Sequence, residues 1–184
     1  MPAKTYTAHS ADIRTEVTNV KFITITAVFL ALTYVFTAFV NIRLPIAAAG
    51  GLIHLGNVPL FICAIIFGKK CGAIAGGFGM ALFDLLSGWT AWAPFTLVIV
   101  AFMGYTVGAL TQKHHGLKWD ALAIAAACVI KVTGYYAAEA LIYGNWAAPA
   151  ASIPGNLVQT GAAAVIVLLT VEKLRTAAYK TILS

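Results

Sequence analysis

Charged residues are scarce in this sequence: Asp, Glu, Lys and Arg together make up only 10% of its 184 residues. A soluble domain carries about 25% of such residues. Hydrophobic residues make up 61% of the chain, and its mean hydropathy is +0.89. The chain lacks the polar surface that a soluble protein needs, so its composition predicts a membrane protein, and its long apolar runs predict the all-α class.

Motifs of nucleotide and hydrolytic chemistry are also absent. No segment matches G-x-x-x-x-G-K-[ST], which holds nucleotide phosphates, and none matches G-x-S-x-G or H-E-x-x-H. The three cysteines, Cys63, Cys71 and Cys128, have no metal-ligand spacing and lie within apolar runs, so we interpret them as small buried hydrophobic residues. We therefore predict no enzymatic activity, no metal site and no cofactor for this chain.

The apolar runs predict six membrane-spanning helices in a single membrane domain. A helix needs about 20 apolar residues to cross the hydrocarbon core of a bilayer. The second and third runs are shorter than this, which suggests tilt, local thinning of the bilayer or shielding by neighbouring helices. The predicted spans cover residues 22–40, 55–67, 72–88, 94–111, 120–143 and 153–172.

The basic residues predict how these spans are oriented. If the polar segment 1–20 lies in the cytoplasm, ten of the 12 Lys and Arg residues fall on inside segments, Arg43 is outside and Lys131 lies within a span. Such an excess of basic residues on one side favours cytoplasmic N- and C-termini. It also accounts for the net charge of +6 without nucleic acid as a partner. The inside set is Lys4, Arg14, Lys21, Lys69, Lys70, Lys113, Lys118, Lys173, Arg175 and Lys180.

With this orientation, a long outer loop, NIRLPIAAAGGLIHLGN, joins the first two spans. The loop is apolar and rich in glycine, and such a composition is poorly suited to contact with water. It is interpreted either as a cap packed over the bundle or as a loop that lies in the membrane interface.

Three charged residues, Asp84, Lys131 and Glu139, lie within predicted spans, where charge is costly and usually faces a cavity or a partner. Lys131 and Glu139 are separated by about 800° of helix rotation, so they share roughly one face, with Tyr135 between them. The alternative for this pair is a structural ion pair. The alternative for Asp84 is that its side chain caps backbone N–H groups in the turn that follows.

Further polar and aromatic residues fall in the same outer half. Asn156 and Gln159 are three residues apart on one helix face, with interhelical hydrogen bonding as the alternative role. For the tryptophans the alternative is an interfacial aromatic belt. A few convergent polar groups in an aromatic setting are typical of a small-molecule pocket. The complete predicted binding set is His54, Asn57, Asp84, Trp89, Trp92, Lys131, Tyr135, Glu139, Asn156 and Gln159.

Small residues recur on two of the predicted spans. Ala27 and Ala31 form an A-x-x-x-A pair in the first span, and glycines repeat in the third. Small residues spaced in this way make a flat strip on which another helix can approach closely. Either strip can serve packing within this chain or contact with a partner.

The stretch from Gly51 to Leu110, which includes GLIHLGNVPLF and GMALFDLLSGWTAWAPF, resembles the S components of energy-coupling factor (ECF) vitamin transporters. It is similar to the riboflavin-type branch, which includes hydroxymethylpyrimidine and pyridoxine members. The resemblance implies capture of a vitamin in the outer half, and docking to a transmembrane coupling subunit held by two cytoplasmic ATPases. It also implies that Ala27 and Ala31 contact the coupling subunit, and that the S component topples within the lipid bilayer during transport.

Two functions are therefore open at this point. The first is an S component that takes up hydroxymethylpyrimidine or pyridoxine, or alternatively pantothenate or riboflavin. The second is a stand-alone proton-coupled carrier that uses Glu139 or Asp84 as its proton site. The two differ in whether the chain transports alone or needs the coupling subunit and ATP.

Overall fold

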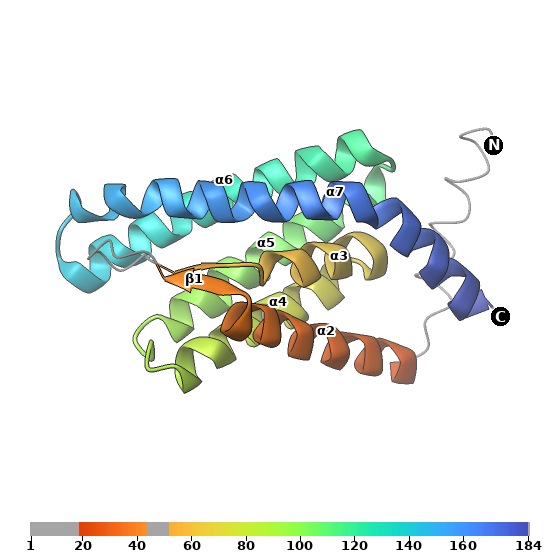
Figure 1. Cartoon of the computed structure of the whole chain (residues 1–184), viewed down its shortest axis with the longest axis horizontal. Helices are drawn as coiled ribbons and strands as arrows, with labels where there is room; N and C mark the ends of the chain where they lie inside the picture. The colour runs from red at the N-terminus through yellow and green to blue at the C-terminus, as the bar shows by residue number, and fades with distance from the viewer. Residues whose placement is uncertain (1–18, 44–51, 184) are drawn as a thin grey trace.

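The computed structural model describes residues 19–43 and 52–183, which form six α-helices, a 3-10 helix and a two-stranded hairpin (Figure 1). The long helices run roughly along the long axis of the molecule, and α2 begins at the same end at which α7 finishes. In chain order the elements are α2 (Asn19–Phe39), β1 (Asn41–Arg43), β2 (Leu52–His54), α3 (Asn57–Phe67), α4 (Lys69–Leu86), α5 (Ala93–Lys113), α6 (Leu117–Tyr143), η1 (Ala148–Ser152) and α7 (Ile153–Leu183).

Four helical segments are long and apolar enough to cross a membrane, namely α2, α5, α6 and the segment Ala148–Thr181. The molecule is therefore a mostly helical membrane protein. Each of the six predicted spans overlaps one of the helices α2 to α7. That α3 and α4 also cross the membrane, and that both termini are cytoplasmic, stay predictions. The last helix also runs 11 residues beyond the predicted end at residue 172.

The segment between α2 and α3 contains an antiparallel hairpin that the sequence did not predict. Asn41 pairs with His54, Ile42 with Ile53 and Arg43 with Leu52. Residues 44–51, the middle of the predicted outer loop, lie outside the described residues, and so do residues 1–18 of the predicted N-terminal segment 1–20, whose last two residues begin α2. In the described part, the hairpin places His54 immediately before α3.

The short helix α3 lies at the centre of the bundle. Nine of its 11 residues are buried, and it packs against α2, α4, α5 and α7. A helix that is hydrophobic all round is stable only when it is covered on all sides. By contrast, α2 exposes large apolar side chains such as Val20, Ile23 and Phe39, as expected of a surface in contact with lipid.

Glycines allow α4 and α5 to pack most closely where α4 begins and α5 ends. A Cβ atom added to Gly72 of α4 would lie 3.1 Å from the carbonyl oxygen of Gly104 in α5, and one added to Gly108 of α5 would lie 2.7 Å from the carbonyl carbon of Gly68, which directly precedes α4. Glycine is the residue that permits such close approach of two helices. The glycine strip of α4 therefore packs within this chain.

A buried ion pair joins α6 to α7 near the end of the molecule at which α7 finishes, here called the termini end. Nη2 of Arg175 donates to both carboxylate oxygens of Asp120, at 3.1 and 2.9 Å. Nη1 of the same guanidinium group donates to Glu172 at 2.9 Å. The side chain of Asp120 is fully buried, so this pair fixes where the first turn of α6 meets α7.

Two of the cysteines also meet near this end. The Sγ atoms of Cys63 and Cys71 are 2.8 Å apart, and the hydroxyl of Thr26 donates to the Sγ of Cys71 at 3.3 Å. Both cysteines are buried, whereas Cys128 is partly exposed. The predicted role as small buried side chains thus describes Cys63 and Cys71 well and Cys128 less well.

Candidate functional site

A small pocket lies at the other end of the molecule, here called the pocket end, where α4 and α6 finish and α5 and α7 begin. Its volume is about 80 Å³. The hairpin contributes to its wall, and the rest comes from the helix ends and from the turn between α4 and α5. The lining residues are Leu52, His54, Phe83, Asp84, Trp89, Trp92, Thr96, Lys131, Tyr135, Glu139, Asn156 and Gln159.

Nine of the ten binding residues predicted from the sequence line this one pocket. They come from the hairpin, from α4, α6 and α7, and from the turn after α4, so the fold brings together groups that are far apart in the chain. The tenth, Asn57, is not among the lining residues. It is fully buried in the first turn of α3, and neither its Nδ2 nor its Oδ1 has a hydrogen-bond partner in the described part of the chain.

The turn after α4 places Asp84, Trp89 and Trp92 at the pocket. The helix ends at Leu86 because Gly88 takes a positive φ of 87°, and the backbone N–H of Trp89 then donates to the carbonyl of Asp84 at 2.9 Å. The side chain of Asp84 caps no backbone N–H group within the described residues, and its Oδ2 is buried without a hydrogen-bond partner there. Capping is therefore not its role.

Lys131 is buried in α6, with 2% of its surface exposed. Its Nζ lies 5.6 Å from the ring centre of Tyr135, one helical turn further on. Across residues 19–43 and 52–183, neither Lys131 nor Glu139 forms an ion pair. The alternative of a structural ion pair between them is therefore wrong, and three charged groups line one pocket without neutralising each other in direct contact.

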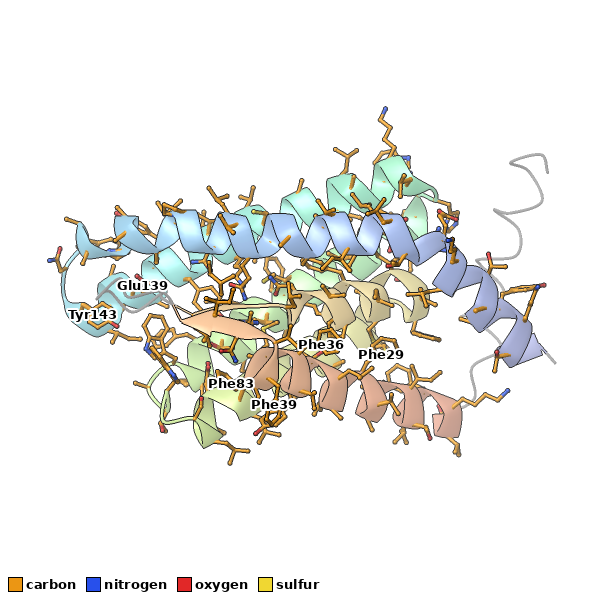
Figure 2. The ribbon with its side chains drawn as sticks, in the orientation of Figure 1. Phe29, Phe36, Phe39, Phe83, Glu139 and Tyr143 are labelled. Carbon is orange, nitrogen blue, oxygen red and sulfur yellow. The ribbon has the colours of Figure 1, made fainter. Side chains whose placement is uncertain are left out.

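The aromatic residues form one wall of the pocket. Trp92 lies 6.3 Å from Tyr135 and 6.2 Å from Tyr143, measured between ring centres. The hydroxyl of Tyr135 donates to the Oγ1 of Thr96 at 3.1 Å. Tyr143 and Glu139 lie near the same end of α6 (Figure 2). Trp92 is largely buried, whereas Trp146 is 64% exposed, so the aromatic-belt interpretation suits Trp146 better.

The amide side chains of α7 complete the pocket. Gln159 is buried, and its Nε2 has no hydrogen-bond partner among the described residues. Nδ2 of Asn156 donates to the carbonyl of Ser152, the last residue of η1, at 3.3 Å, just before its own helix begins. The alternative of interhelical hydrogen bonding is therefore not seen for either amide, and Asn156 presents its Oδ1 as an acceptor.

His54 lies on the hairpin, outside the spanning helices. Burial, followed by the positive charge of Lys131, lowers the pKa of His54 well below its ordinary value. The imidazole is therefore neutral near pH 7. Its Nδ1 accepts from the backbone N–H of Gly56 at 3.2 Å, which assigns the proton to Nε2. Neutral His54 thus adds an N–H donor to the pocket wall.

Three lining residues, Leu52, Phe83 and Thr96, were not predicted from the sequence. Leucine, phenylalanine and threonine are common in spanning helices and nearby loops, so their presence is no signal. Thr96 could have been found only through Tyr135, whose hydroxyl needs a partner when buried.

The chain is similar in sequence to known membrane transport proteins. The sequence pattern of the ECF-type riboflavin transporter, S component, matches residues 17–176. The chain is 33% identical over 141 residues to the thiamine precursor transporter HmpT of Lactococcus lactis subsp. cremoris (strain MG1363). The aligned segment covers 77% of this chain and 80% of that protein. It is also 33% identical over 103 residues to an uncharacterised protein of Pyrococcus woesei, which covers 56% of this chain and 69% of the relative.

Proposed function

The chain belongs to the family of ECF-type riboflavin transporter S components, and from this premise we propose that its pocket captures a small vitamin precursor for ATP-driven uptake. The family comprises membrane subunits of transporters rather than enzymes. We propose hydroxymethylpyrimidine, a thiamine precursor, or a pyridoxine-like ring as the substrate, ahead of pantothenate and riboflavin.

The main support for this proposal is that buried polar atoms in the pocket lack hydrogen-bond partners within the described residues. Asp84 and Gln159 each present a buried atom without a partner in the described part of the chain, next to an aromatic wall. Buried polar groups are normally paired, and exceptions point to a function. A flat heterocycle can stack on Trp92 while it hydrogen-bonds to these groups. A volume of about 80 Å³ suits a single ring better than a three-ring flavin.

Ligand identification is the direct test. The purified full chain is analysed by mass spectrometry for co-purified molecules and titrated by calorimetry with hydroxymethylpyrimidine, pyridoxine, pantothenate and riboflavin. Binding of one of the first two in preference to the others is the expected result. Failure to bind any of the four, with a folded protein and no vitamin-like molecule co-purified, contradicts the proposal.

Asn156 gives a point test of the pocket. Replacing Asn156 by Ala removes an amide oxygen from the wall, and if a bound ligand then loses its partner, binding weakens by about 1–3 kcal/mol. Calorimetry measures this change, and circular dichroism checks that the helices are intact. Unchanged affinity would remove Asn156 from the binding set. Val158→Ala is a suitable control, because Val158 is on the same helix and exposed away from the pocket.

We further propose that the chain docks to a transmembrane coupling subunit carrying two ATPases, with six spans, cytoplasmic termini and the pocket end outward. Ala27 and Ala31 support this, because both lie exposed on α2 and their lack of bulk allows close helix packing. Neither is among the residues that line the pocket, so contact with a partner and capture of the ligand should be separable.

Ala31→Trp tests this separation. We expect the isolated variant to bind its ligand normally, whereas complex formation and ATP-driven uptake in liposomes both fall sharply. The matched control is Ala125→Trp, at an exposed alanine of α6. Normal assembly and transport by Ala31→Trp would show that the strip faces lipid. Uptake by the chain alone, driven by a pH gradient, would favour the proton-coupled carrier instead.

A further inference from the structure

Two buried polar atoms that line the pocket lack a hydrogen-bond partner within the described residues. Oδ2 of Asp84 is an acceptor without a donor, and Nε2 of Gln159 is a donor without an acceptor. Leaving such atoms unpaired away from water is unfavourable. The pocket therefore has an unmet need for one hydrogen-bond donor and one acceptor, which a ligand can supply.

Lys131 adds another donor to this set. Its side chain lines the pocket and forms no ion pair in the part of the chain that the structure describes. The ring of Tyr135, 5.6 Å from Nζ, offers a cation–π contact but no hydrogen-bond acceptor. Because an ammonium group carries three N–H bonds, Lys131 calls for an acceptor atom on the ligand.

The unpaired acceptor of Asp84 and the unpaired donors lie on different helices. Asp84 is on α4, which packs against α2, α3 and α5, whereas Lys131 is on α6, which packs against α5 and α7, and Gln159 is on α7. Within the described residues, a ligand in the pocket thus meets an unpaired carboxylate oxygen from α4 and unpaired N–H groups from α6 and α7. It matches the pocket best when its donor and its acceptors lie on different edges.

We propose that this arrangement selects an amino-substituted nitrogen heterocycle. The exocyclic amino group donates to Asp84, and a ring nitrogen and a hydroxyl oxygen accept from Gln159 and Lys131. An amino group conjugated to such a ring acts as a donor and not as an acceptor, so it suits a carboxylate and would be mismatched against Lys131 or Gln159. The inference rests on the proposed function and narrows its substrate class to aminopyrimidines, ahead of hydroxypyridines such as pyridoxine.

The test uses two probes, hydroxymethylpyrimidine and the analogue in which hydrogen replaces its amino group, titrated by calorimetry into the full chain. The wild-type protein should bind the aminated probe about 10- to 100-fold more tightly, because a hydrogen bond to a charged group is lost with the analogue. Asp84→Asn should lose most of this preference. Val158→Ala is the control, and it should keep the preference, because Val158 is exposed on α7 and is not among the residues that line the pocket.

Gln159→Met provides a second variant in case Asp84→Asn does not fold. This variant should bind both probes more weakly, to a similar degree, and should keep the preference for the probe that carries the amino group. Equal binding of the two probes by the wild type would overturn this inference while leaving the proposed function intact. So would a preference that survives in Asp84→Asn or disappears in Val158→Ala or Gln159→Met. If the wild type binds neither probe and none of pyridoxine, pantothenate and riboflavin, this inference and the proposed function are both overturned.

Discussion

The two ends of the molecule bury charged side chains in opposite ways. At the termini end, Asp120 and Arg175 meet in a two-pronged ion pair, and Glu172 takes a further N–H of the same guanidinium group. At the pocket end, Asp84, Lys131 and Glu139 line one cavity without forming an ion pair within the described residues. Among the described residues, the buried charges are thus joined in ion pairs at one end and are without an ion pair at the other.

This difference supports the proposal that the termini end serves stability and the pocket end serves binding. A buried charge without a partner destabilises the protein that contains it, so such groups are found mainly where a ligand or a substrate pathway requires them. The paired charges hold α6 against α7, whereas the unpaired ones remain available to a ligand. Substitutions at the two ends should therefore have effects of opposite sign on stability.

The largest effect is expected when the ion pair is broken. Arg175→Met removes the guanidinium group that binds the fully buried carboxylate of Asp120, and loss of one partner from such a pair costs about 3–5 kcal/mol. Thermal unfolding in detergent measures this loss. Lys173→Met, at an exposed neighbour in α7, is the control. A melting temperature of Arg175→Met equal to that of the control would show that the pair contributes little to stability.

A smaller loss is expected from the close contact between α4 and α5 at the termini end. In Gly108→Ala the new Cβ meets backbone atoms of Gly68 and Lys69, which cannot move aside as a flexible side chain can, and such overpacking costs about 1–3 kcal/mol. Gly161→Ala in α7 is the matched control, because a Cβ there meets nothing within 4 Å. That control should gain up to about 1 kcal/mol from better helix propensity. Equal stability of the two variants would contradict the close packing.

The smallest effect should have the opposite sign. Lys131→Met replaces a buried cation that has no ion-pair partner in the described chain, so the ligand-free protein should become more stable by about 0.5–2 kcal/mol. Ligand binding should weaken in the same variant. Lys118→Met, at an exposed residue in the first turn of α6, should change neither property. A less stable Lys131→Met protein would mean that Lys131 supports the fold, and the contrast between the two ends would then fail.

The pocket could be predicted from the sequence largely because polar residues are conspicuous in apolar spans. Polar and charged side chains are energetically costly within a membrane, so the presence of Asp84, Lys131 and Gln159 in predicted spans strongly indicates a functional site. The same signal cannot tell a pocket from an enclosed core, which is why Asn57 was included although it does not line the cavity. Thr96 and Phe83 gave no signal, since such residues are common in any spanning helix.

The buried ion pair at the termini end could not be predicted from the sequence. Arg175 was predicted to follow a last span ending at residue 172, whereas α7 continues to Leu183 and Arg175 is buried against Asp120. That Arg175 lies on the cytoplasmic side stays a prediction. These residues are 55 positions apart, and no local pattern reveals a contact over that distance. The hairpin was missed for a related reason, because its strands have only three residues each, too few for an alternating pattern to be recognised.

The distribution of the four tryptophans makes their intrinsic fluorescence sensitive to the pocket. Trp89 and Trp92 line the pocket, whereas Trp119 stacks on His114 near the termini end, with ring centres 3.9 Å apart, and Trp146 is exposed. An aromatic ligand in the pocket would change the emission of the first two and leave the other two as a constant background. The occupancy of the pocket can therefore be followed by intrinsic fluorescence without a label, and replacing Trp92 by Phe should remove much of the ligand-dependent signal.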